Sequence, residues 1–138
     1  MVTKILVDSD IESGRRLLEK LDEEGMKVDA ALWAYDPETH RYQFIIGSGE
    51  VEERGARPFY TGIQHALESL PDEEKQVSFS DVAVTSLSTS VVGSLSTRIN
   101  TPSNAIESIR ITDEVVDREV IDDAYVYRLH VANNDANR

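Results

Sequence analysis

The sequence predicts an α+β fold with about five mainly antiparallel strands, arranged as two hairpins and one further strand, and with two or three helices packed on one face. The segments 28–46 and 109–131 alternate in the way typical of paired strands. The segments 9–25 and 58–70 instead place apolar residues at helical spacing. Hairpins combined with amphipathic helices assemble most simply as one sheet with the helices on a single side.

The chain of 138 residues has the length of one domain, and a domain of this size buries roughly two-thirds of its unfolded surface. We expect the domain to span residues 1–132. Residues 133–138 offer no large apolar side chain to a core, so we expect them to form a frayed C-terminal tail. Residues 2–7 fit either a short strand or the first turns of the helix that follows.

The first predicted helix begins near Ser9, because a serine followed three residues later by Glu12 forms a capping-box pattern. Asp8 and Asp10 favour the positive end of a helix dipole. Gly25 is suited to the C-terminal cap, where the left-handed conformation is common. The apolar stripe of this helix comprises Ile11, Leu17, Leu18 and Leu21.

The first hairpin, residues 28–46, has the clearest strand pattern in the chain. Trp33 and Tyr35 share one face of its first strand, and the return strand alternates in the same way. The intervening residues 36–40 read DPETH, in which aspartate followed by proline favours a turn. Because this loop is longer than a two-residue turn, it leaves the register open by about one residue.

Residues 47–70 predict a turn and a second helix. The glycines and serine at 47–49 lack the lysine and the longer spacing of a phosphate-binding loop, so we interpret them as a plain turn. Pro58 suits the first position of a helix, and Pro71 marks its end.

The region 77–99 is less regular. Residues 77–84 predict a third strand. The hydroxyl-rich segment 85–97 fits a short helix, a strand or a loop, and we favour the helix. Its apolar positions at near-helical spacing are Val91, Val92, Leu95 and Ile99.

The last third of the chain predicts the second hairpin. Ile109 and Ile111 alternate in its first strand, which extends to Val115, and residues 124–131 form its second strand. Residues 117–119, with the sequence Asp-Arg-Glu, are the predicted turn.

The net charge of −12 is the strongest bulk property of the chain. It disfavours direct binding to a nucleic-acid backbone or to an anionic membrane, because both would repel the protein. Solubility, a high-salt habitat and an acidic face for a basic partner all explain the charge, and we favour solubility. The chain has no cysteine, no apolar run long enough to span a bilayer and no secretory signal at its start. We therefore predict a cytoplasmic protein.

Metal-ligating residue types are present without a known metal-binding pattern. His40, His65 and His130 lack the short spacing of zinc sites, so we interpret them as surface residues. Acidic residues gather around the last turn, but they lack the calcium-loop pattern, which favours a solvated turn. The alternative is a metal-dependent hydrolase or nuclease centred near Asp122. The acidic residues are Asp113, Glu114, Asp117, Glu119, Asp122 and Asp123.

A further alternative is a sensor of a small anionic ligand. Arg54 and Arg57 interrupt the acidic background, and Arg57 directly precedes a helix whose N-terminus attracts anions. Together with Tyr60, these arginines could hold a phosphate or a carboxylate. We favour ion pairing of the arginines with neighbouring glutamates.

The strand aromatics are the candidate interaction surface. Trp33 and Tyr35 share one strand face, and Tyr125 and Tyr127 share another. Under a helix these side chains belong to the core, whereas on a bare face they anchor a partner. No serine-nucleophile motif or other catalytic constellation is found. We therefore predict a non-catalytic protein without a cofactor that acts through protein–protein contact, as an accessory subunit or a homo-oligomer.

Overall fold

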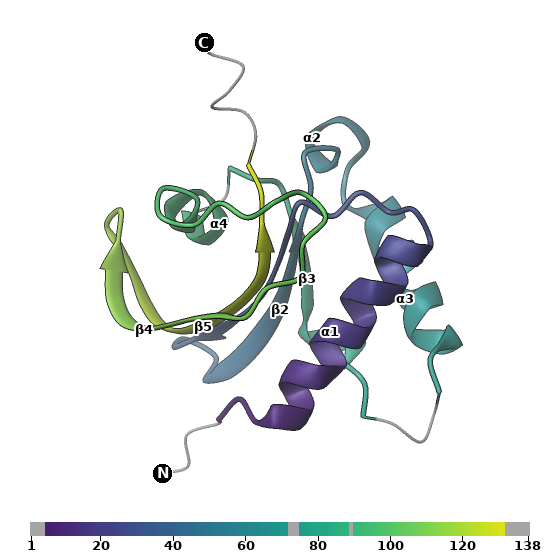
Figure 1. The fold of residues 1–138 in the computed structure, drawn as a ribbon, viewed down its shortest axis with the longest axis horizontal. Coiled ribbons are helices and arrows are strands. Elements are labelled where there is room, and N and C mark those ends of the chain that lie inside the picture. Colours follow the sequence, from purple (N-terminus) through teal and green to yellow (C-terminus); the bar gives the residue numbers. More distant parts are fainter. Residues whose placement is uncertain (1–4, 72–74, 89, 132–138) are drawn as a thin grey trace.

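The computed structural model describes residues 5–71, 75–88 and 90–131, which form one five-stranded sheet and four α-helices (Figure 1). This confirms the predicted α+β fold with five strands. The strands are β1 (Ala30–Asp36), β2 (Arg41–Gly47), β3 (Val82–Thr85), β4 (Ile109–Val116) and β5 (Glu119–Leu129). The helices are α1 (Asp8–Glu23), α2 (Val51–Arg54), α3 (Arg57–Ser69) and α4 (Ser90–Leu95), and a 3-10 turn, η1 (Phe79–Asp81), precedes β3.

The sheet has the strand order β3-β2-β1-β5-β4 and is mixed rather than mainly antiparallel, because β3 runs parallel to β2. The other three neighbouring pairs are antiparallel. Between β2 and β3 the chain passes through α2 and α3, and such a helical crossover is the connection that parallel neighbours require. The predicted third strand therefore lies at an edge of the sheet.

The first predicted hairpin is confirmed as β1 and β2. Trp33 lies opposite Phe44, and Asp36 lies opposite Arg41, so the loop consists of the four residues between the strands. A side-chain oxygen of Asp36 accepts the backbone N–H of Glu38 at 3.0 Å, which is the turn chemistry expected of an aspartate at this position.

The second predicted hairpin is confirmed as β4 and β5. Asp117 and Arg118 form its two-residue turn, with φ angles of 49° and 71°. Positive φ at both positions is what a type I′ hairpin turn requires. β5 begins at Glu119, earlier than predicted, because strand pairing resumes directly after this turn.

The sheet is covered on both faces. Alternation along the strands directs Trp33 and Tyr127 toward α1 and α3, on a side that we call the α1 face. Leu32 and Val126 point toward α4, on the opposite side, which we call the α4 face. Figure 1 shows α4 inside the curve made by β4 and β5, whereas α1 and α3 lie on the outer side. The two long helices thus share one face as predicted, while the short α4 covers the other.

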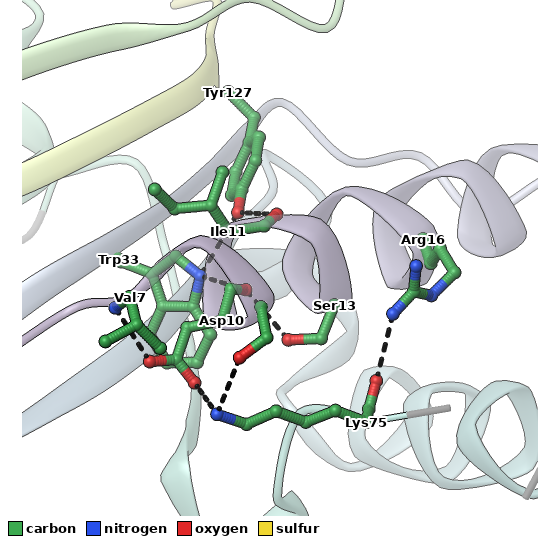
Figure 2. A network of polar contacts seen from close by, with 9 residues as sticks. Val7, Asp10, Ile11, Ser13, Arg16, Trp33, Lys75 and Tyr127 are labelled. Atoms are coloured by element: carbon green, nitrogen blue, oxygen red, sulfur yellow. Dashed lines mark hydrogen bonds and ion pairs between the residues drawn. The ribbon is translucent and has the colours of Figure 1, made fainter. Parts of the chain in front are cut away.

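The start of α1 is held by a polar network that differs from the predicted capping box. Asp10 rather than Glu12 accepts a backbone N–H at the helix start, that of Val7, at 3.1 Å. Lys75 Nζ lies 2.6 Å from an Asp10 carboxylate oxygen and 3.2 Å from the hydroxyl of Ser9 (Figure 2). These contacts connect the helix start to the segment that follows α3.

Gly14 allows α1 to approach the sheet closely. A Cβ at this position would lie 2.8 Å from Trp33 Nε1, 2.9 Å from Phe44 Cε1, and closer still to the hydroxyl oxygen of Tyr127. That hydroxyl donates to the backbone carbonyl of Ile11 at 2.6 Å and accepts from Trp33 Nε1 at 3.1 Å (Figure 2). Because Gly14 has no side chain, the hydrogen-bonded pair of Trp33 and Tyr127 fits beneath α1.

Within the hydroxyl-rich segment 85–97, α4 confirms the short helix that we favoured. Residues 5–7, the described part of 2–7, form neither strand nor helix. The predicted tail 133–138 lies outside the described residues. In the part of the chain that the structure describes, no helix has the length and apolar content needed to cross a lipid bilayer.

Candidate functional site

Two of the four aromatic residues predicted for an interaction surface, Trp33 and Tyr127, are core residues instead. Trp33 is 5% exposed and Tyr127 is fully buried, because α1 lies directly over both rings. Trp33 Nε1–H also points at the backbone carbonyl of Asp10 at 3.2 Å, so both polar groups are bonded to α1 (Figure 2). Burial raises the pKa of the Tyr127 phenol above its ordinary value.

The other two predicted residues, Tyr35 and Tyr125, are half-buried. They project from the same α1 face, each two residues along its strand from its buried neighbour, Trp33 or Tyr127. The ring of Tyr35 packs edge-on against Tyr42 at 5.2 Å between centroids, and its hydroxyl lies 3.3 Å from Nδ1 of His40. Tyr125 packs against Tyr127 at 5.2 Å. These two tyrosines thus lie where the helical cover of the sheet ends.

A polar triad lies beside them. Asp123 receives two hydrogen bonds from Arg110, from Nε at 2.6 Å and from Nη2 at 2.8 Å, and a third from the hydroxyl of Tyr42. Burial alone would raise the pKa of Asp123, but the bonds from Arg110 and Tyr42 outweigh it and lower that pKa. Burial and the bond to Asp123 together raise the pKa of Tyr42 to about 12. Asp123 is therefore a fixed anion that holds Arg110 against the sheet.

The β4–β5 hairpin carries two exposed apolar side chains. Val115 is 61% exposed and Val120 is 67% exposed, and the two face each other across the strands. Their neighbours Val116 and Ile121 are buried on the α4 face, so alternation directs both valines to the α1 side. In the part of the chain that the structure describes, no helix lies over this outer side of the hairpin (Figure 1). We name this surface the uncovered patch, which comprises Tyr35, Arg110, Val115, Val120 and Tyr125.

The outer edge of β4 is protected from pairing with another strand. Asp113 has a φ of 52°, which interrupts the regular register between Thr112 and Glu114. Arg98 pairs with Glu114 at 2.7 Å and donates to the carbonyl of Val115 at 3.4 Å. Kinks and charged side chains of this kind block edge-to-edge association. A partner would therefore contact the side chains of the patch rather than the β4 backbone.

Of the predicted anion-binding residues, Arg57 and Tyr60 lie about one turn apart on α3, and Arg54 ends α2. The hydroxyl of Tyr60 accepts the backbone N–H of Val84 at 3.0 Å, so it supports β3. Arg54 lines a cleft of about 410 Å³ to which neither Arg57 nor Tyr60 contributes. This cleft is therefore not an anion site shared by the three residues.

The histidines and acidic residues that were considered as metal ligands are not grouped in the described part of the chain. Within residues 5–71, 75–88 and 90–131, no three His, Asp or Glu side chains are placed to hold a metal ion. Asp123, one of the acids around the last turn, is engaged with Arg110. His65 lies 3.6 Å from Glu24 at the surface, and His40 lies in the β1–β2 turn. The acidic residues near Asp122 thus lie on the β4–β5 hairpin, where Asp123 is paired with Arg110.

Sequence reasoning missed a cleft of about 900 Å³. It lies between the end of α1, the start of β1, the turn after β2 and the end of β5. Asp29 and Arg128, which line it, are 7% and 2% exposed despite their charge. The one sequence signal was Arg128, a charged residue within an apolar strand.

Comparison with known proteins gives no relative from which a role could be inferred. No protein-family model, curated protein or solved structure matches this chain.

Proposed function

We propose that this protein is a non-catalytic binding module that contacts a basic partner protein through the uncovered patch. The supporting observation is that half-buried tyrosines, an arginine fixed by Asp123 and two exposed valines project from the α1 side of the strands, and that among the described residues no helix lies over the outer side of the β4–β5 hairpin (Figure 1). Tyrosine and arginine side chains carry much of the binding energy at protein interfaces. Because Arg110 is held by Asp123, it loses little conformational freedom when a partner binds.

The charge around the patch supports a basic partner. Residues 109–123 contain six acidic and two basic side chains, so an apolar and aromatic centre is surrounded by negative charge. Such an arrangement attracts a positively charged surface and repels another copy of a chain with a net charge of −12. The proposal therefore commits to an accessory role beside a different protein rather than to a homo-oligomer.

Affinity capture with matched variants tests this proposal. The immobilised protein is incubated with an extract of the cells that naturally produce it, and retained proteins are compared between wild type and the Val120→Glu variant. We expect a basic protein that wild type retains and Val120→Glu loses, with retention that falls steeply as salt is raised, because screening weakens charge attraction. Light scattering of the purified chain should give the mass of a monomer.

Ile5→Glu is the matched control, because Ile5 is 67% exposed like Val120 but lines a different cleft beside Lys75. It should retain the same partner as wild type. The proposal is wrong if no retained protein depends on Val120, or if both variants lose the partner equally. Unfolding midpoints equal to that of wild type would show that neither substitution acts through the fold.

A further inference from the structure

The cleft beside Asp29 and Arg128 is lined by none of the residues of the uncovered patch, and charged groups on its walls set its chemistry. Asp29 comes from the segment before β1, Arg128 and His130 from the end of β5, and Asp22 from the end of α1. Its volume of about 900 Å³ is within the range of small-molecule sites. Both acidic and basic side chains line it, so their pairing decides which charge a ligand would meet.

Arg128 is fully engaged by the protein itself. Its Nη1 and Nη2 groups donate to the two carboxylate oxygens of Asp22 at 3.0 and 2.8 Å. Further bonds run from Nη1 to the carbonyl of Val28 at 3.1 Å and from Nε to the carbonyl of Ala105 at 2.8 Å. The positive charge is thus balanced by Asp22, and this pair forms a rigid wall of the cleft rather than an anion-binding group.

Asp29 differs, because one of its carboxylate oxygens is weakly engaged. Oδ2 accepts the backbone N–H of Gly49 at 2.9 Å, which fixes the orientation of the group. Oδ1 lies 4.0 Å from Nζ of Lys27, whose side chain is 59% exposed, whereas that of Asp29 is 10% exposed. An ion pair at this distance with a solvated lysine is weak and readily exchanged. The cleft therefore presents an oriented, largely buried anion.

His130 adds a hydrogen-bond acceptor to the same cleft. Its Nδ1 lies 2.8 Å from the carbonyl oxygen of Thr101, and a carbonyl can only accept, so Nδ1 carries the proton. With the proton on Nδ1, the uncharged form of the ring has an acceptor at Nε2. The backbone N–H of His130 donates to the carbonyl of Asp29 at 2.8 Å, which couples the two residues directly.

We propose that this cleft binds a small molecule that carries a protonated amino group, with Asp29 as its counter-ion in place of Lys27. A buried carboxylate and a histidine acceptor select a ligand that donates hydrogen bonds and carries positive charge. Met26 and Leu87, which also line the cleft, suit an apolar body attached to that amino group. This inference is independent of the proposed partner binding, since it uses none of the patch residues.

Calorimetric titration with 2-phenylethylamine and with 2-phenylethanol tests the proposal, because the two probes differ only in the charged group. We expect the amine to bind with a dissociation constant of a few millimolar or lower, on the order of fragment affinities, and the alcohol to bind at least about tenfold more weakly. In amide NMR spectra, the amine should shift the resonances of Gly49 and His130 first.

Three variants separate the site from general charge effects. Asp29→Asn keeps an oxygen that can accept the Gly49 N–H, and it should weaken amine binding by about tenfold or more. Lys27→Ala should strengthen binding by a few fold, because it removes the competing cation. Glu19→Gln, an exposed position on α1, makes the same charge change as Asp29→Asn and should have no effect. The proposal is overturned if the amine does not bind, if the alcohol binds equally well, or if Asp29→Asn behaves like Glu19→Gln.

Discussion

Replacement of Gly14 by alanine should destabilise the protein although glycine lies in the middle of a helix. In an open helix, alanine is favoured over glycine by about 1 kcal/mol. Here the added Cβ would overlap the Tyr127 hydroxyl and lie within 2.9 Å of atoms of Trp33 and Phe44. Overpacking of this kind costs about 1–3 kcal/mol. Loss of the two hydrogen bonds made by the Tyr127 hydroxyl adds about 1 kcal/mol for each.

The net expectation is a loss of roughly 2–4 kcal/mol in the free energy of unfolding, after the gain in helix propensity is subtracted. Urea unfolding followed by the fluorescence of Trp33, the only tryptophan, measures this directly. With an m-value of about 2 kcal/mol/M, the midpoint should fall by roughly 1–2 M. A Gly14→Ala variant that is as stable as wild type would refute the proposed packing of α1.

Two comparisons make the Gly14 prediction specific. Gly93 in α4 has no atom closer than 3.7 Å to a Cβ built on it, so Gly93→Ala should be neutral or stabilising by up to about 1 kcal/mol. In a Tyr127→Phe background the hydroxyl is absent, so Gly14→Ala should cost less than it does in wild type. If Gly14→Ala costs the same free energy of unfolding in wild type and in Tyr127→Phe, the added Cβ does not clash with the Tyr127 hydroxyl.

The remaining predictions concern the two ion pairs Arg128–Asp22 and Arg110–Asp123. Arg128→Ala leaves the carboxylate of Asp22 and two backbone carbonyls without their partner, so it should lower the free energy of unfolding by about 3–5 kcal/mol. The partial exposure of Asp22 to water reduces this loss. Thermal unfolding measures the change, and a value below about 1 kcal/mol would contradict the prediction. For Asp123, the folded pKa lies below the unfolded one, so the carboxylate contributes stability above an unfolded pKa of about 3.9, and this contribution is lost as the pH falls through the folded value. Asp123→Asn should therefore be less stable than wild type at pH 7, and the difference should shrink when urea midpoints are compared at about pH 3. A difference that is independent of pH would contradict the assigned ionisation.

Local patterns predicted most of the elements, because each depends on residues close together in the sequence. Alternation around Trp33 identified β1, and the turn chemistry of Asp36 closed the first hairpin at the predicted loop. The parallel pairing of β3 with β2 was not predictable in this way. It depends on which edge of the sheet the chain reaches after α3, and the crossover length permits more than one choice.

Periodicity also showed that Trp33 and Tyr35 share a face, but it could not show that the cover by α1 ends between them. That boundary decides which aromatic residues are core and which form the uncovered patch. The cleft was missed for a related reason: Asp29 and Arg128 are about a hundred positions apart, and only the antiparallel pairing of β1 with β5 brings them together.

Amide NMR of the isotopically labelled protein, titrated with the basic partner retained by wild type, tests the central claim most directly. We predict that the largest shifts and losses of signal map to Val115, Val120 and Tyr125 on the uncovered patch. Resonances of α3, on the covered part of the same face, should stay unchanged. Shifts that map instead to α3 or to the cleft beside Asp29, with the patch unaffected, would contradict the account.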